Sequence, residues 1–422
     1  MSTKERRLTF DKSFGTDGIT YFKFDQSRPY VTSITLTADN EIYLTGNNIS
    51  HDRQQSQFWV TRLSNRGEVD QHFASHSPIP GVILDEFRPG IRAGSVRLNI
   101  LNNTDILVVG IDQEENYTGL ARYLRSGSPN LAFGKSGKVL LTEIPPYQPN
   151  NPSAVTLYRP TAIELPNGKI AVASTTAVNV IPKGIRTVSV IYRLNANGDL
   201  DKTLNGLGYF PVEKADPVGN STDLDDLLLQ SDGKFVAFGT FWDHQKQFVM
   251  FTRYTSEGEL DTSFGDEGFR LISYPHPQPV QMIKHKDGRL RGIAHGYAPD
   301  PYGLLVGLTK DGDLDETFNS GEPLKIYINE KWTEFHGGMF DGNDNLVVVG
   351  AGHLPNNPET DSLVARFLPN GAFDETFNGQ GWDLPNMSSV LDFAASVVVQ
   401  PDGKLLFAGG TEERAYVARL IP

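Results

Sequence analysis

Short apolar runs separated by turn residues follow one another along the chain and predict β-strands rather than helices. Asn-Gly and Asp-Gly pairs favour hairpin turns, because both central residues must accept a positive φ. After each turn pair the chain is largely apolar and then reaches a small residue, a pattern typical of a strand covered on both faces. The turn pairs are Asp39-Asn40, Asn103-Thr104, Asn167-Gly168, Asp232-Gly233, Asp287-Gly288, Asp344-Asn345 and Asp402-Gly403, and the small residues are Gly46, Gly110, Ser174, Gly239, Ala294, Gly350 and Gly409.

A second motif, which we call the anchor motif, recurs at intervals of about 60 residues. Its clearest copy reads Gly258-Glu-Leu-Asp261-Thr-Ser-Phe264-Gly-Asp-Glu-Gly268. The seven anchor positions are Asp11, Asp70, Asn130, Asp201, Asp261, Asp315 and Asp374. The large apolar residues three positions later are Phe14, Phe73, Phe133, Leu204, Phe264, Phe318 and Phe377. Strands ending in arginine precede the motif at Arg62, Arg122, Arg193, Arg253, Arg366 and Arg419, with Gly307 at this position in the fifth copy.

Each copy therefore contains four predicted strands: A after the anchor motif, B before the turn pair, C after it, and D with the arginine. Four antiparallel strands in a repeated unit of this length are typical of a propeller blade. We predict an all-β protein, a single seven-bladed β-propeller over residues 1–422 with four-stranded antiparallel blades. The predicted blades are 18–64, 80–125, 137–195, 208–255, 268–309, 322–368 and 381–421.

The two ends of the chain are complementary. The first anchor motif has no arginine strand before it, and the last arginine strand has no anchor motif after it. Juxtaposed N- and C-termini, with residues 8–17 closing the ring, would complete the seventh copy and remove exposed sheet edges.

The anchor motif itself predicts a structural role, since a residue repeated in every blade cannot mark one unique site. We expect its aromatic residue to fill the gap between adjacent blades. We expect its aspartate to accept backbone N–H bonds in the connecting turn, or to pair with the strand-D arginine that precedes it.

The Leu-Asp-x-x-Phe-Gly-x-x-Gly pattern, with an Asp-Gly-Lys turn between copies, resembles the bacterial delta-60 repeat family. The resemblance covers essentially the whole chain and is best at Asp11, Asp261 and Asp374. The second copy has Ser77 in place of the final glycine, and the fourth has Leu204-Asn205 for Phe-Gly. The resemblance implies a β-propeller that often occurs in secreted or surface proteins, and it implies no catalytic residues.

The amino-acid composition limits the classes of partner and the cellular compartments that we expect. The formal charge of −13 argues against nucleic acid and anionic membranes, because both require a basic surface. No apolar run is long enough to predict membrane insertion, and the first ten residues lack the apolar core of a signal peptide. We therefore expect a protein that is cytoplasmic or exported by a non-classical route, and the resemblance implies a bacterial source. The absence of cysteine excludes disulfides, thiol catalysis and cysteine-ligated metals.

The predicted topology places the A–B and C–D loops on one face of the ring, which we call the variable face because these loops differ from copy to copy. Aromatic and histidine side chains on rigid loops suit stacking on sugars or docking onto a protein. We predict a non-enzymatic binding scaffold that recognises a protein or a glycan through this face. The predicted ligand-binding residues are Trp242, His244, His295, Tyr297, Trp332, His336 and His353.

Two other functions stay open: a hydrolase or lyase with its site at the mouth of the central channel, and a structural spacer in a surface or secretion assembly. Packing of the aromatic residues under their own loops is the simpler interpretation of the predicted site. We expect no cofactor; calcium is the one candidate, at Asp311, Asp313, Asp315 and Glu322, although Glu316 occupies the position that requires glycine. We expect the acidic run Asp223, Asp225 and Asp226 to be a solvated loop.

Overall fold

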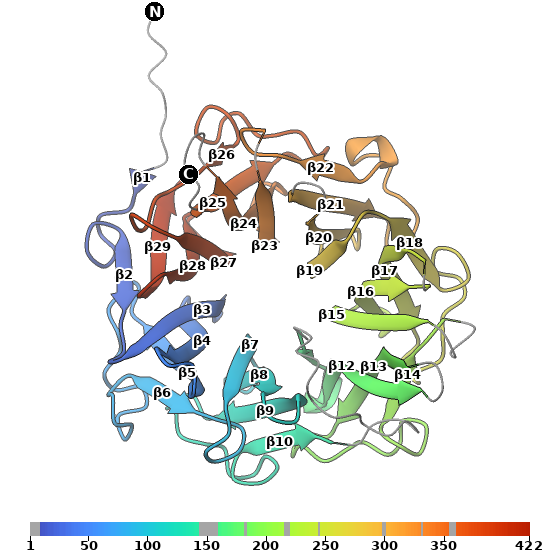
Figure 1. Ribbon diagram of the computed structural model, residues 1–422, viewed down its shortest axis with the longest axis horizontal. Helices are drawn as coiled ribbons and strands as arrows, with labels where there is room; N and C mark the ends of the chain where they lie inside the picture. Colours follow the sequence, from blue (N-terminus) through green and yellow to red (C-terminus); the bar gives the residue numbers. More distant parts are fainter. Residues whose placement is uncertain are drawn as a thin grey trace, which may run out of the picture.

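The computed structural model describes residues 9–142, 159–180, 184–214, 220–243, 245–297, 301–330, 332–353 and 360–422. Seven antiparallel sheets form a closed ring in which one edge strand of each sheet lies nearest the ring axis (Figure 1). This confirms the predicted seven-bladed propeller with four-stranded blades. The described ranges hold no helix with the length and apolar character that crossing a bilayer requires.

Within each of the first six blades, the strands follow one another outward from the ring axis in chain order. Blades one to four are β3 (Ser27–Leu36), β4 (Ile42–Ser50), β5 (Ser56–Leu63) and β6 (Val82–Asp85); β7 (Ala93–Ile100), β8 (Ile106–Asp112), β9 (Tyr117–Tyr123) and β10 (Lys138–Leu141); β11 (Thr161–Glu164), β12 (Ile170–Val180), β13 (Gly184–Leu194) and β14 (Tyr209–Val212); and β15 (Ser221–Leu229), β16 (Phe235–Trp242), β17 (Gln247–Tyr254) and β18 (Phe269–Ser273). Blades five to seven are β19 (Pro277–Lys284), β20 (Leu290–Gly296), β21 (Tyr302–Leu308) and β22 (Leu324–Ile326); β23 (Thr333–Phe340), β24 (Leu346–His353), β25 (Thr360–Phe367) and β26 (Trp382–Asp383); and β27 (Asp392–Val399), β28 (Leu405–Thr411) and β29 (Ala415–Ile421), completed by β1 (Thr9–Phe10) and β2 (Ile19–Phe22). Two 3-10 turns are Pro166–Gly168 and Asn319–Gly321.

The strand after each anchor motif is the outermost strand of the preceding blade. In the first blade, for example, β6 pairs with β5, and the anchor motif forms the connection between them. The first sheet thus spans residues 27–85 rather than the predicted 18–64. The predicted ranges 80–125 and 137–195 and the other four are shifted in the same way, because each assigns the strand after the anchor motif to the following blade instead of the preceding one. The physical reason is the short D–A connection, which keeps these two strands adjacent as an antiparallel pair.

The chain ends close the ring through the seventh blade. Both β1 and β2 pair with β29, with Phe10 opposite Leu420 and Thr20 opposite Val417. In Figure 1 the blue N-terminal strands lie beside the red C-terminal blade. The outer edge of β29 is thereby covered, as the complementary ends of the sequence predicted.

The anchor aromatic residues pack between neighbouring blades. All seven positions are at most 1 % exposed. Gly312, at the start of the next anchor motif, has a φ of +88° and would place a Cβ 2.8 Å from the Phe264 ring. Glycine is therefore required there both for the backbone conformation and for the close approach of the aromatic ring.

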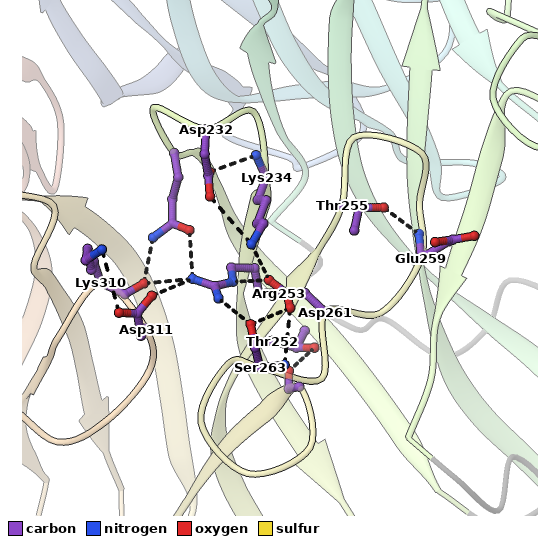
Figure 2. A network of polar contacts seen from close by, with 12 residues as sticks. Asp232, Lys234, Thr252, Arg253, Thr255, Glu259, Asp261, Ser263, Lys310 and Asp311 are labelled. Atoms are coloured by element: carbon purple, nitrogen blue, oxygen red, sulfur yellow. Dashed lines mark hydrogen bonds and ion pairs between the residues drawn. The ribbon is translucent and has the colours of Figure 1, made fainter.

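The anchor aspartate performs both predicted roles at once. Asp261 accepts the Ser263 N–H (3.1 Å) through one oxygen and pairs with Arg253 Nε (2.7 Å) through the other (Figure 2). Arg253 also donates to the Lys310 carbonyl of the next blade (3.0 Å) and lies 4.9 Å over the Phe264 ring. Arg62, Arg122, Arg193 and Arg419 likewise donate to a backbone carbonyl of the following blade.

Two copies of the repeat lack either the anchor aspartate or the strand-D arginine, and another residue takes its place in the ion pair. Where the anchor is Asn130, Arg122 pairs instead with Asp105 (2.8 Å), which also accepts the Asn130 amide (2.7 Å). Where the usual arginine position is glycine, Arg291 from the neighbouring strand β20 pairs with Asp315 (2.8 Å). The ion pair is retained although its residues differ in origin.

A β-bulge in the innermost strand of six blades explains the small residue after the apolar run of those blades. In β23 the register shifts between Phe335 and Gly337, which leaves His336 as the extra residue. A Cβ at the facing Gly350 would overlap the carbonyl oxygen of Glu334. The other register shifts lie between Val31 and Ser33, Ser95 and Arg97, Leu224 and Asp226, Pro279 and Gln281, and Ala394 and Ser396.

Gly350→Ala is expected to destabilise the fold by about 1–3 kcal/mol, because the bulged backbone must move to admit the methyl group. The matched control is Gly342→Ala, where nothing lies within 4 Å of the added Cβ, and we expect a change within about 0.5 kcal/mol. Urea unfolding of both variants measures the difference. Equal stability of the two variants would show that the bulge does not constrain this position.

Candidate functional site

Three of the predicted binding residues lie together at the variable-face end of blades five and six. The His295 ring is 5.2 Å from the Tyr297 ring and 6.0 Å from the His336 ring. We expected all three in loops, but His295 belongs to β20 and His336 is the extra residue of the β23 bulge. Glu334, two residues before His336, completes this group and did not appear among the predicted residues.

The other predicted residues lie apart from this group or outside the described ranges. Trp332 and His353 face each other in blade six, with ring centroids 4.4 Å apart. Trp242 ends β16 in blade four and is 40 % exposed. His244 lies outside the described residues.

The hydrogen bonds of His295 fix its tautomer. Its Nδ1 lies 2.9 Å from the Phe335 carbonyl oxygen, which can only accept, so Nδ1 carries the proton. Its Nε2 then accepts the Tyr297 hydroxyl (3.3 Å). Burial, together with the positive charge of His336, lowers the pKa of His295 to about 4. His295 is therefore neutral at pH 7 and orients the Tyr297 phenol.

Glu334 and His336 form an ion pair on the innermost strand. His336 Nδ1 lies 2.9 Å from the Ala394 carbonyl oxygen and its Nε2 lies 3.4 Å from Glu334 Oε2. Both ring nitrogens face acceptors, an arrangement that the imidazolium satisfies with two donors. Burial acts to raise the pKa of Glu334, but the His336 hydrogen bond and nearby positive charges outweigh it, and the net pKa is lowered.

The acidic run of blade four is part of a strand, so its assignment to a solvated loop was wrong. Asp223, Asp225 and Asp226 belong to β15, and Asp225 is the extra residue of its bulge. Burial, together with the neighbouring carboxyl groups, raises the pKa of Asp225 to about 8, and burial raises that of Asp223 to about 6. Asp226 accepts the Met282 N–H (2.8 Å) and lies 3.3 Å from Arg97, which links blades two, four and five.

Arg159 is a further residue of the site that the sequence did not indicate. It directly precedes β11, and its charge lowers the pKa of Asp225 in blade four and of Glu334 in blade six. The same charge acts on His295 and Tyr297 of blade five. Arg159 is therefore within electrostatic reach of side chains of three other blades. We call the whole group the axial cluster, and its members are Arg159, Asp225, His295, Tyr297, Glu334 and His336.

The structure places the calcium candidate in arginine pairs. Asp311 pairs with Arg253 (3.3 Å), Asp313 with Arg270 (3.0 Å), and Asp315 with Arg291. Within the part of the chain that the structure describes, no group of three or more His, Asp or Glu side chains is arranged to hold a metal ion. We do not propose a metal site.

A separate groove of ≈ 540 Å³ lies between the outer parts of blades five and six. Its lining includes Glu316, Lys325, Tyr327 and Phe373. Lys325 Nζ lies 4.1 Å over the buried Tyr302 ring, so the cation already has an aromatic partner within the chain. The groove shares no lining residue with the axial cluster.

Asp225→Asn is expected to change the pH dependence of stability. The folded chain holds the Asp225 proton up to pH about 8, whereas an unfolded chain releases it near pH about 4, so the native protein loses stability as the pH rises across this window. The variant is expected to match the wild type at pH 4 and to exceed it by about 1 kcal/mol or more at pH 8.5. Urea unfolding at both pH values measures this, with the exposed Asp39→Asn as control. A pH-independent difference would contradict the raised pKa.

Several solved structures are similar to this chain over most of its length. A virginiamycin B lyase from Staphylococcus aureus has 14 % identity and a TM-score of 0.49, covering 96 % of this chain and 99 % of that one. The α-L-arabinofuranosidase of Fusarium graminearum has 11 % identity and a TM-score of 0.43, covering 98 % and 96 %. The β-propeller domain of the Trilobed protease from Pyrococcus furiosus has 7 % identity and a TM-score of 0.44, covering 93 % and 95 %. These likenesses are too distant to indicate an activity.

Comparison with known sequences matches only two segments of the chain. No curated protein matches the chain. A family profile described as "Domain of unknown function (DUF5122) beta-propeller" matches residues 165–204 and 342–377. Each matched segment runs from a B–C turn through strands C and D to the anchor aromatic position, so it contains the anchor ion pair of its blade. The match supports a relationship to a β-propeller family whose function is unknown.

Proposed function

We propose that this protein is a non-enzymatic binding scaffold that recognises a glycan at the axial cluster. One observation carries the proposal: hydrogen-bonding and charged side chains from blades three to six converge at one end of the ring. Glu334 offers acceptors, Arg159 offers donors, and the Tyr297 ring is 50 % exposed for stacking against a sugar. A few convergent polar groups beside an aromatic surface suit a polyhydroxylated ligand.

The hydrogen bonds within the cluster favour recognition over proton transfer. Burial raises the pKa of the Tyr297 phenol, whereas the pKa of its partner His295 is about 4. Transfer of the phenol proton to His295 is therefore strongly unfavourable. Glu334 is likewise held by His336, so both pairs serve to fix side-chain positions.

A glycan array followed by calorimetric titration of the strongest ligand tests the proposal. Glu334→Gln and Tyr297→Ala are each expected to weaken binding about tenfold or more, because each removes a direct contact to the sugar. Leu131→Ala is the control, since Leu131 is 74 % exposed and lies in an anchor motif on the opposite face. Unchanged affinity in both cluster variants, with circular dichroism showing native folds, would rule out this site.

A hydrolase or lyase is the second candidate, favoured by the opposite pKa shifts of two carboxyl groups in one cluster. Asp225, with a pKa of about 8, would be a proton donor at neutral pH, and Glu334, with a lowered pKa, would be a base. Release of reducing ends from the bound glycan tests this function, and Asp225→Asn should abolish it. Binding without turnover would exclude the enzyme, and absence of both would favour a structural spacer.

A further inference from the structure

We infer that the axial cluster selects an acidic sugar, a uronic acid residue whose carboxylate pairs with Arg159. The inference rests on the proposed glycan binding and names the ligand class of that same site. It follows from which charges of the site are paired within the chain and which are not.

Among the basic side chains that the structure describes around the cluster, Arg159 differs in having no acidic partner. Asp226 lies 3.3 Å from Arg97, and Glu334 lies 3.4 Å from His336, so Arg97 and His336 each face a carboxyl group. Across the described ranges, no hydrogen bond or ion pair of Arg159 occurs, although Arg159 is partly buried. A partly buried guanidinium without a partner is costly, and a carboxylate satisfies it with two parallel hydrogen bonds.

The nearby Asp225 does not cancel this charge at neutral pH. With a pKa of about 8 its carboxyl group is largely protonated at pH 7, and in the described part of the chain it has no hydrogen bond or ion pair. A protonated carboxyl group both donates and accepts, which suits a sugar hydroxyl. The positive charge of Arg159 thus remains available within a protein whose formal net charge is −13.

The other members of the cluster favour a sugar acid over a simple carboxylate. Tyr297 is half exposed beside Glu334, so a ring stacked on its phenol would bring hydroxyl groups toward the carboxylate. A uronic acid combines the three features that these residues would recognise: a carboxylate, vicinal hydroxyl groups and a ring face.

Calorimetric titration with matched trisaccharides tests the inference. The probes are trimers of galacturonic and glucuronic acid and their neutral galactose and glucose counterparts with the same linkages. At pH 7 and low salt, the wild type is expected to bind at least one acidic trimer about tenfold more tightly than its neutral counterpart. Arg159→Gln is expected to reduce this ratio to about one. The control Arg125→Gln changes a 45 % exposed arginine of the opposite face and should keep the ratio.

The outcomes separate this inference from the proposed function. An acidic preference that survives Arg159→Gln, or a wild type that binds neutral glycans equally or better, overturns the uronate assignment and leaves glycan binding intact. Failure of all four trimers and of a wider glycan array overturns both.

A pH series supplies an independent readout. Between pH 7 and pH 9 ionisation of Asp225 would offset Arg159, so affinity for the acidic probe should fall more than affinity for the neutral one. The charged groups that act on Asp225 are Asp223 and Asp226 on its own strand, Arg97 on β7 and Arg159 before β11. Asp225→Asn should remove the additional fall, and a variant that retains it would contradict the role of Arg159.

Discussion

A chain that begins at residue 23 is expected to lose the closed ring and to form oligomers or aggregates. It lacks β1 and β2, which cover the outer edge of β29, and it lacks Phe14, which is fully buried between the seventh and first blades. It also lacks Asp11, the partner of Arg419 (2.9 Å). Loss of a buried aromatic residue alone costs about 3–5 kcal/mol, and an uncovered apolar edge strand promotes association. Size-exclusion chromatography with light scattering measures the outcome.

The matched control is a chain that begins at residue 9, which keeps both N-terminal strands and should remain monomeric. A synthetic peptide of residues 9–24, added in trans, should restore the monomer by occupying the same edge. A monomeric chain from residue 23 with native near-ultraviolet circular dichroism and an unchanged melting temperature would show that the terminal strands do not close the ring.

Arg253→Ala is the second large effect, with an expected loss of about 3–5 kcal/mol. The side chain of Arg253 is 4 % exposed, and its removal takes from Asp261 its cation at 2.7 Å and from the Lys310 carbonyl of the next blade one of its two donors, the other being Gln230. Arg125→Ala is the control, because its side chain is 45 % exposed and its pair with Glu41 should contribute less than about 1 kcal/mol. Urea unfolding of both variants measures the contrast, and equal losses would contradict the role assigned to the anchor network.

The same network predicts a loss of stability in acid. Burial acts to raise the pKa of Asp261, but its hydrogen bonds and cations hold it well below the ordinary value. A lowered pKa contributes stability that is present above pH about 4 and is lost as the pH falls below that value. The wild type should therefore lose stability below pH 4 more steeply than Arg253→Ala, in which Asp261 has lost part of its stabilisation.

The fold could be predicted from the sequence because the repeat has a clear period and complementary ends. The first and last residue of each blade could not be predicted, because the repeat length does not show whether the strand after the anchor motif belongs to the preceding or the following sheet. The sequence did contain a signal for one of the substitute partners, Asp105. Lys234 pairs with Asp261 (2.9 Å) from the position after the turn pair, and the corresponding position of the copy anchored by Asn130 is Asp105. The side chain at this position is therefore negative, not positive, in the copy whose anchor residue is the uncharged Asn130.

The candidate site was only partly predictable. His295, Tyr297 and His336 followed from their residue types on the variable face. Glu334 and Asp225 did not, because an apolar strand pattern does not show where a bulge interrupts the innermost strand. Aligning the blades at the extra residue of each bulge would have provided a signal. Asp225 and His336 then occupy the same alignment position, at which the other bulged blades have uncharged residues. The electrostatic effect of Arg159 depends on how blades three to six are arranged in space, which one sequence does not reveal.

A crystal structure of the protein soaked with trigalacturonate tests the central claim most directly. We expect density for the sugar at the variable-face end of the ring axis, with a carboxylate on Arg159 and a ring against Tyr297. Density confined to the ≈ 540 Å³ groove beside Lys325 and Tyr327, or a fully resolved axial cluster without ligand at saturating concentration, would contradict it.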